Sequence, residues 1–294
     1  MDIDEKPWSQ SKNERNSREN MNCMEVCGGH GEGVSYYRRP GLDVWVLSRV
    51  KQDVTSGGGD LHLLSSCASG RITRMLLADI CGFGPLFHGV ATRLREVMKR
   101  NVNTIRQARS VRQMSQQLSA ASQRGGFAST LMSTYFAPTR SFALCNAGHP
   151  PPMMYRMKTR QWSLMKQQPA ATVTGGSEPG VVDPSEYQQF KTTLEVGDMV
   201  LTFSNSLTES RTRDGQTLGV GGLLDRVRQC DSAKPSAIPE TLLNQLKGGS
   251  TNDVDHEDAT VMLCQATETP VAWRDNLLAP FRLIRGATDR TSFT

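Results

Sequence analysis

Short runs of apolar residues, rich in β-branched and aromatic side chains, recur along the chain and are typical of β-strands. Each run is four to seven residues long, which favours a strand over a buried helix. Between two of the runs, residues 137–140 (APTR) are expected to form the turn of a β-hairpin. The predicted strands cover residues 42–47, 74–79, 130–136, 142–145, 199–203 and 260–264.

A second kind of segment has apolar residues at every third or fourth position, as in an amphipathic helix. Residues 90–102 and 105–121 show this spacing, and a shorter helix is predicted from Pro239 to Leu246, before two glycines. The helices come in pairs between groups of strands, without the strict strand–helix alternation of a parallel sheet. The pattern therefore predicts an α+β fold with antiparallel sheets.

The distribution of polar residues divides the chain into three parts. Residues 1–21 are polar and charged with almost nothing to bury, and we expect a flexible tail there. Residues 22–267 are expected to form one domain, followed by a C-terminal extension at 268–294. With 37% hydrophobic and 21% charged residues in 294, the chain can build a sizeable core.

Charge and composition exclude several other classes of protein. The net charge of +5 comes from Lys and Arg scattered along the chain, whereas nucleic-acid-binding proteins gather them on one face. No apolar run approaches the ~18 residues needed to cross a bilayer, and the first residues lack the apolar core of a secretory signal. Seven cysteines at irregular spacing are typical of reduced thiols. We therefore expect a cytoplasmic protein that binds neither nucleic acid nor membrane.

Oxygen-bearing side chains stand at four places, each at the edge of an apolar run. An isolated aspartate in such a place usually forms a turn or caps a helix. Carboxylates and backbone carbonyls are also the ligands that hard cations such as Mg²⁺ and Mn²⁺ prefer, so the set is a candidate metal site. Its members are Asp60, which follows three glycines, then Asp79, Asn205, and the pair Glu257 and Asp258.

Eight short motifs appear in a fixed order between about residues 41 and 265. The most characteristic is NAGHPP at 146–151. On this ordered set the chain resembles the PPM-type metal-dependent protein phosphatases, in the branch that includes sporulation protein E and RsbU-like regulators of sigma-factor pathways. The other motifs are GGD at 58–60, ADICGFG at 78–84, GFAST at 126–130, GD at 197–198, SNS at 204–206, LG at 218–219 and EDAT at 257–260.

The resemblance implies a four-layer α/β/β/α sandwich with two central antiparallel sheets. It implies a hydrolase in which two Mn²⁺ or Mg²⁺ ions activate the water that attacks the phosphorus of phosphoserine or phosphothreonine. It also implies a phosphorylated regulatory protein as the substrate, in bacterial signalling, and control by an upstream sensor. By position in the motifs, Asp60 and Asp79 would be catalytic, and the metal ligands would be Asp60, Asp79, the backbone carbonyl of Ile80, Asn205, Glu257 and Asp258.

Two of these ligand positions depart from the family pattern. Asn205 stands where the family usually has an aspartate, and an amide oxygen brings no negative charge. Glu257 stands where the first of two aspartates is usual, and its carboxylate is one methylene further out. Two interpretations therefore remain open: a metal-dependent phosphatase with one weakened site, or a pseudophosphatase that keeps the fold as a binding or regulatory module.

Three further features have simpler explanations. His149, within NAGHPP, is expected to stabilise a turn. Cys23, Cys27 and His30 have a spacing that fits part of a zinc site, but no fourth ligand follows at the distance found in zinc fingers. Arg74, at the start of the strand before Asp79, is expected at a solvated strand end.

Overall fold

The computed structural model describes residues 25–50, 59–67, 70–81, 85–101, 127–165, 188–212, 214–247 and 258–269. The flexible tail predicted at 1–21 and the helix predicted at 105–121 lie outside these ranges. So do Cys23, Glu257, and residues 270–294 of the C-terminal extension.

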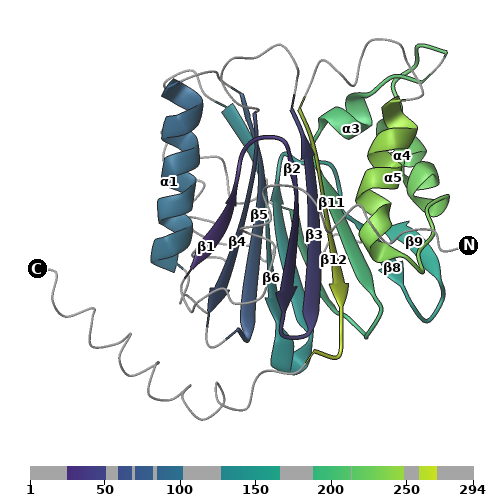
Figure 1. Cartoon of the computed structure of the whole chain (residues 1–294). Helices are drawn as coiled ribbons and strands as arrows, with labels where there is room; N and C mark the ends of the chain where they lie inside the picture. Colours follow the sequence, from purple (N-terminus) through teal and green to yellow (C-terminus); the bar gives the residue numbers. More distant parts are fainter. Residues whose placement is uncertain are drawn as a thin grey trace, which may run out of the picture.

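Two six-stranded sheets form the centre of the molecule (Figure 1). All the strand pairs in both sheets are antiparallel. The first sheet has the order β1 (Val26–Gly29), β4 (Asp60–Cys67), β5 (Ile72–Cys81), β6 (Phe127–Phe136), β7 (Ser141–Ala147), β10 (Gln188–Thr193). The second has the order β2 (Gly33–Arg39), β3 (Leu42–Arg49), β12 (Ala259–Ala266), β11 (Met199–Phe203), β8 (Met153–Arg156), β9 (Gln161–Leu164).

All six predicted strands are present, and most are longer than the sequence indicated. The predicted hairpin turn at 137–140 contains the 3₁₀ turn η2 (Ala137–Thr139) and joins β6 to β7. Six strands were missed, namely β1, β2, β4, β8, β9 and β10, and of these β4 carries Asp60.

Helices cover the outer face of each sheet. On the first sheet lies α1 (Pro85–Asn101), and on the second lie α4 (Gly219–Arg228) and α5 (Ile238–Lys247). The remaining helical pieces are α3 (Ser206–Glu209) and the 3₁₀ turn η4 (Pro235–Ala237). The helix predicted at 90–102 begins five residues earlier, at Pro85, because proline is well placed at the first position of a helix.

Three apolar clusters hold these four layers together. Leu94 of α1 packs with Leu76 of β5 on the outer face of the first sheet, and Leu242 of α5 packs with Leu263 of β12 on the outer face of the second. Between the sheets, side chains of both sheets form one cluster, including Leu64, Val44 and Val200. The α+β fold with two antiparallel sheets is confirmed, and its layers follow the α/β/β/α order that the family resemblance implied.

Arg74 corrects one expectation. Its side chain lies on the helix-covered face of the first sheet and is only 2% exposed, so it is not at a solvated strand end. Alternation along β5 places Arg74 on the same face as Leu76 and Ala78. The strand was predicted to begin at Arg74, but β5 begins two residues earlier, at Ile72, so Arg74 lies inside the strand.

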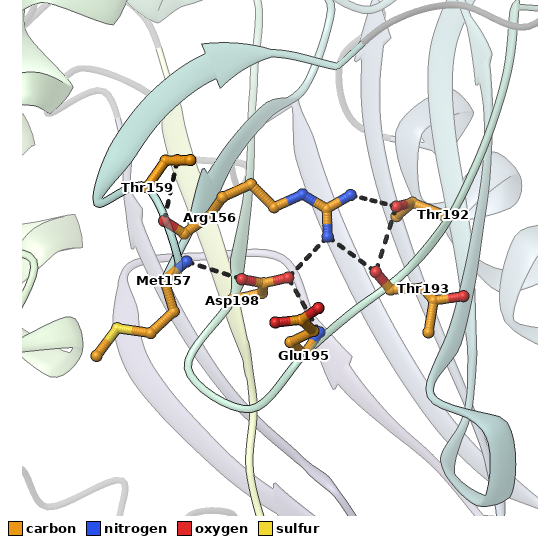
Figure 2. Close-up of polar contacts among 7 residues, drawn as sticks. All are labelled: Arg156, Met157, Thr159, Thr192, Thr193, Glu195 and Asp198. Carbon is orange, nitrogen blue, oxygen red and sulfur yellow. Dashed lines mark hydrogen bonds and ion pairs between the residues drawn. The ribbon is translucent and has the colours of Figure 1, made fainter.

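A buried carboxylate joins the two sheets at the start of β11 (Figure 2). Asp198 accepts hydrogen bonds from the Arg156 guanidinium at 2.7 Å and from the backbone N–H groups of Met157 and Glu195 at 2.8 and 3.0 Å. Arg156 in turn donates to the Thr193 carbonyl of β10 at 2.8 Å. The second sheet is thereby fixed to the edge of the first at the end of β11 remote from Asn205.

None of the helices in the described ranges is long and apolar enough to cross a membrane.

Candidate active site

Asp60 and Asp79 are brought together by the register of the first sheet. Asp60 opens β4 and pairs directly with Asp79 near the end of β5. Directly opposed residues of antiparallel strands point to the same face of the sheet. Since Leu61 and Leu63 pack toward α1, alternation turns the Asp60 side chain toward the second sheet. The two predicted catalytic carboxylates therefore lie side by side at one end of the gap between the sheets.

The second sheet supplies hydroxyl groups to Asp60. The side-chain hydroxyls of Thr260, on β12, and Ser204, directly after β11, interact with the Asp60 carboxylate and favour its ionised form. The Ser204 hydroxyl also accepts the backbone N–H of Thr260 at 2.9 Å, which fixes the ends of β11 and β12 to each other. The sequence assigned no role to either hydroxyl, because local spacing does not show contacts between different sheets.

Asp258 and Ile80 complete the described part of the site around Gly59. The Gly59 N–H donates to Asp258 Oδ2, across the two sheets. The Gly59 carbonyl accepts the Ile80 N–H at 2.7 Å. A Cβ at Gly59 would lie 2.9 Å from the Ile80 carbonyl oxygen, 3.6 Å from Asp258 Oδ2 and 3.9 Å from Asp79 Oδ1. Only glycine allows the backbone to approach this carbonyl and these two carboxylates so closely.

Burial and neighbouring charges raise the pKa of Asp60. The Asp60 side chain is buried, and its desolvation is the largest cause of the rise to about 8. The negative charges of Asp79 and, to a smaller extent, Asp258 raise the pKa further, while the hydrogen bonds from Thr260 and Ser204 oppose the rise. Three carboxylates that repel one another in a buried place are a combination that a cation would stabilise.

Asn205 also presents an oxygen without a hydrogen-bonding partner. The Asn205 side-chain carbonyl, Oδ1, is buried and unbonded, as is Oδ2 of Asp60. Asn205 follows Ser204 directly, and its own backbone carbonyl begins α3 by accepting the N–H groups of Thr208 and Glu209. The Asn205 and Asp60 oxygens therefore keep acceptor capacity that a water molecule or a cation can use.

The donor set fits a divalent metal ion. Carboxylate, amide and backbone carbonyl oxygens suit Mg²⁺ and Mn²⁺, and the unbonded oxygens of Asp60 and Asn205 supply unused acceptor capacity. Within the described ranges, no three side chains of the His, Cys, Asp or Glu type are already arranged as a metal cage. A cage of fully charged ligands would not be stable without its ion, because the carboxylates repel one another.

His149 has a structural role next to this site. The Asn146 side-chain amide donates to the His149 carbonyl at 2.8 Å, and its oxygen accepts the His149 N–H at 2.9 Å. Gly148 closes the turn with a φ of 84°. The buried imidazole reaches the Ser129 carbonyl of β6 at 3.2 Å. The motif therefore forms a turn, as the sequence predicted, and also fixes that turn to the first sheet.

Comparison with known proteins places this chain within a family. The family model described as Stage II sporulation protein E (SpoIIE) matches residues 69–267, which is more than half of the chain. A search of curated protein sequences gave no significant match.

Solved structures support the same fold. The RsbU and RsbW domains of a Mycobacterium tuberculosis protein are 18% identical with a TM-score of 0.60, and the match covers 79% of this chain and 63% of that one. The phosphatase domain of SpoIIE from Bacillus subtilis is 12% identical with a TM-score of 0.58, covering 80% and 97%. RsbX in complex with magnesium is 14% identical with a TM-score of 0.55, covering 80% and 100%. The chain spans less than two thirds of the first of these relatives and nearly all of the other two. From the family match and this fold, the chain belongs to the SpoIIE family of PPM-type phosphatases.

Proposed function

We propose that this protein is a metal-dependent serine/threonine phosphoprotein phosphatase that acts in bacterial signalling. The observation that carries the proposal is the buried Asp60 carboxylate, which faces Asp79 and has an unbonded oxygen. Its raised pKa means that ionised Asp60 needs a nearby positive charge. Because the chain belongs to a phosphatase family, a bound metal ion that supplied this charge would also have a catalytic role.

In this proposal Asp60 and Asp79 are the central ligands, joined by the Ile80 carbonyl, Asn205, Glu257 and Asp258. Bound Mn²⁺ or Mg²⁺ would lower the pKa of a water molecule and neutralise charge on the phosphoryl oxygens. The Ser204 and Thr260 hydroxyls favour the ionised form of Asp60, and Gly59 leaves room for the Ile80 carbonyl.

One observation favours a second function. Asn205 replaces a carboxylate at a ligand position, and a neutral amide binds a divalent ion less strongly. If the site holds metal too weakly for turnover, the chain is a pseudophosphatase that uses the same surface to bind a phosphorylated partner.

Hydrolysis of p-nitrophenyl phosphate and of a phosphoserine peptide separates the two functions. Mn²⁺ is titrated from micromolar to millimolar concentration with the wild type, Asp60→Asn and Asn205→Asp. The phosphatase proposal predicts metal-dependent turnover in the wild type, loss of at least about 100-fold in Asp60→Asn, and a lower Mn²⁺ requirement in Asn205→Asp. Turnover that appears only in Asn205→Asp would establish the pseudophosphatase instead.

A further inference from the structure

A cluster of basic side chains lies beside the candidate active site, on the edge formed by β1 and α1. His30 lies in the turn between β1 and β2, and His88 lies in the first turn of α1. Their rings meet edge to face, with centroids 5.2 Å apart. Both side chains are exposed, so the pair is part of the molecular surface.

Arg95 fixes the arrangement of this pair. It lies two turns after His88 on α1 and donates one hydrogen bond to the Val26 carbonyl at 3.1 Å and another to the Gly28 carbonyl. These bonds fasten α1 to β1, and in Figure 1 the helix stands beside that strand. Both acceptors are neutral carbonyl oxygens, so these two bonds bring no negative charge to the guanidinium.

The electrostatics of the cluster favour an anion. Burial lowers the pKa of His30, and the charges of His88 and Arg95 lower it further. An anionic group placed against the three side chains would offset this repulsion and favour the protonated form of His30. The same positive field opposes a metal cation, which argues against a zinc site built on His30 and Cys27.

The topology places the cluster at the same end of the sandwich as the carboxylates. Gly29, directly before His30, pairs with His62, and His62 lies two residues after Asp60 on β4. The helix that carries His88 begins six residues after Asp79. A protein segment that is bound at the carboxylates and continues toward β1 would reach this edge.

We propose that His30, His88 and Arg95 form a docking point for acidic side chains that flank the phosphorylated residue of the protein substrate. This inference rests on the proposed function, because it assigns a sequence preference to the same site. The partner is a phosphoprotein with Asp or Glu close to its phosphoserine or phosphothreonine. The three groups position the substrate and do not touch the reacting phosphorus.

Binding of peptides that cannot be hydrolysed tests the proposal. Fluorescence anisotropy at pH 5.5 and low salt compares two peptides with a phosphonate in place of phosphoserine, one with acidic and one with neutral flanking residues. We expect the wild type to prefer the acidic peptide by about fivefold, because each exposed ion pair contributes a modest amount. The preference should shrink as salt rises.

Matched variants then locate the preference. In the double variant His30→Gln, His88→Gln it should fall below about twofold, with unchanged affinity for the neutral peptide. Lys99→Gln, exposed about 16 Å further along α1, should keep it. Glu32→Gln removes an acidic, exposed side chain from the same turn and should increase it.

Three results would overturn the docking point: equal binding of both peptides by the wild type, an undiminished preference in the double variant, or no binding of either peptide. These results are independent of turnover, so they are distinct from failure of the phosphatase proposal. If the chain does hydrolyse phosphopeptides, the double variant should turn over the neutral one within about twofold of the wild type, since neither histidine contacts the reacting atoms.

Discussion

Removing the charge of Asp60 should stabilise the metal-free protein at neutral and alkaline pH. Asp60→Asn preserves the shape of the side chain and abolishes its ionisation. In the wild type the folded state holds the Asp60 pKa at about 8, above the 3.8 usual for the group. As pH rises, the unfolded chain releases this proton first, so the folded state loses stability from about pH 4 until the loss is complete near pH 8.

The pKa rise sets the size of the effect. At about 1.4 kcal/mol for each pKa unit, the full rise corresponds to an upper limit of about 6 kcal/mol. Between pH 5 and pH 8 the stability of the wild type relative to Asp60→Asn should fall by up to about 4 kcal/mol. The cause is mainly desolvation of a carboxylate, with the charges of Asp79 and Asp258 in addition.

Urea unfolding in EDTA, followed by circular dichroism from pH 5 to pH 9, measures this difference. Asp225→Asn serves as the control, because Asp225 is exposed on α4 and its ion pair with Arg228 lies in solvent. Adding Mn²⁺ should restore the stability of the wild type and have little effect on Asp60→Asn. A difference between the two proteins that does not change with pH, or a variant that is less stable at pH 8, would refute the reasoning.

Three other changes have expected outcomes. Gly59→Ala places a Cβ 2.9 Å from the Ile80 carbonyl oxygen, so it should lower the unfolding free energy by about 1–3 kcal/mol and weaken Mn²⁺ binding, measured by thermal denaturation and calorimetry. Asp198→Asn disturbs a carboxylate that accepts three hydrogen bonds and should cost about 2–4 kcal/mol of stability, whereas Asp225→Asn should cost less than about 0.5 kcal/mol. Burial lowers the pKa of His149 to about 4, so the unfolded chain takes up a proton as pH falls below about 6.5 and the folded state loses stability down to about pH 4. His149→Gln should remove up to about 3 kcal/mol of that loss of stability at acid pH. If the unfolding free energy of the variant fell toward acid pH as steeply as that of the wild type, the lowered pKa of His149 would be contradicted.

The sequence predicted the fold class well because its central strands are apolar and short. The run at 199–203 matches β11 at both ends, since all five of its residues are buried. β4 escaped notice because its sequence, DLHLLSSC, contains an acid, a histidine and two serines, although every residue in it is buried. Local pattern could not reveal that Asp60 and His62 would face a neighbouring sheet.

The candidate site was predicted as a set of residues but not as a geometry. Strand-end position and motif order indicated Asp60 and Asp79, and the β4–β5 register places them opposite each other. The contacts of Ser204 and Thr260 with Asp60 join different sheets, and no spacing in the sequence encodes them. The metal-ligand roles of the six predicted positions remain predictions, namely Asp60, Asp79, Ile80, Asn205, Glu257 and Asp258.

Anomalous diffraction at the manganese edge, from crystals grown with millimolar Mn²⁺, tests the central claim most directly. The account predicts a peak between the two sheets, within bonding distance of carboxylate oxygens of Asp60 and Asp79, and no such peak in crystals of Asp60→Asn. Wild-type crystals without a peak at these carboxylates, or with manganese bound only elsewhere on the protein, would contradict the claim that this acidic cluster is a metal centre.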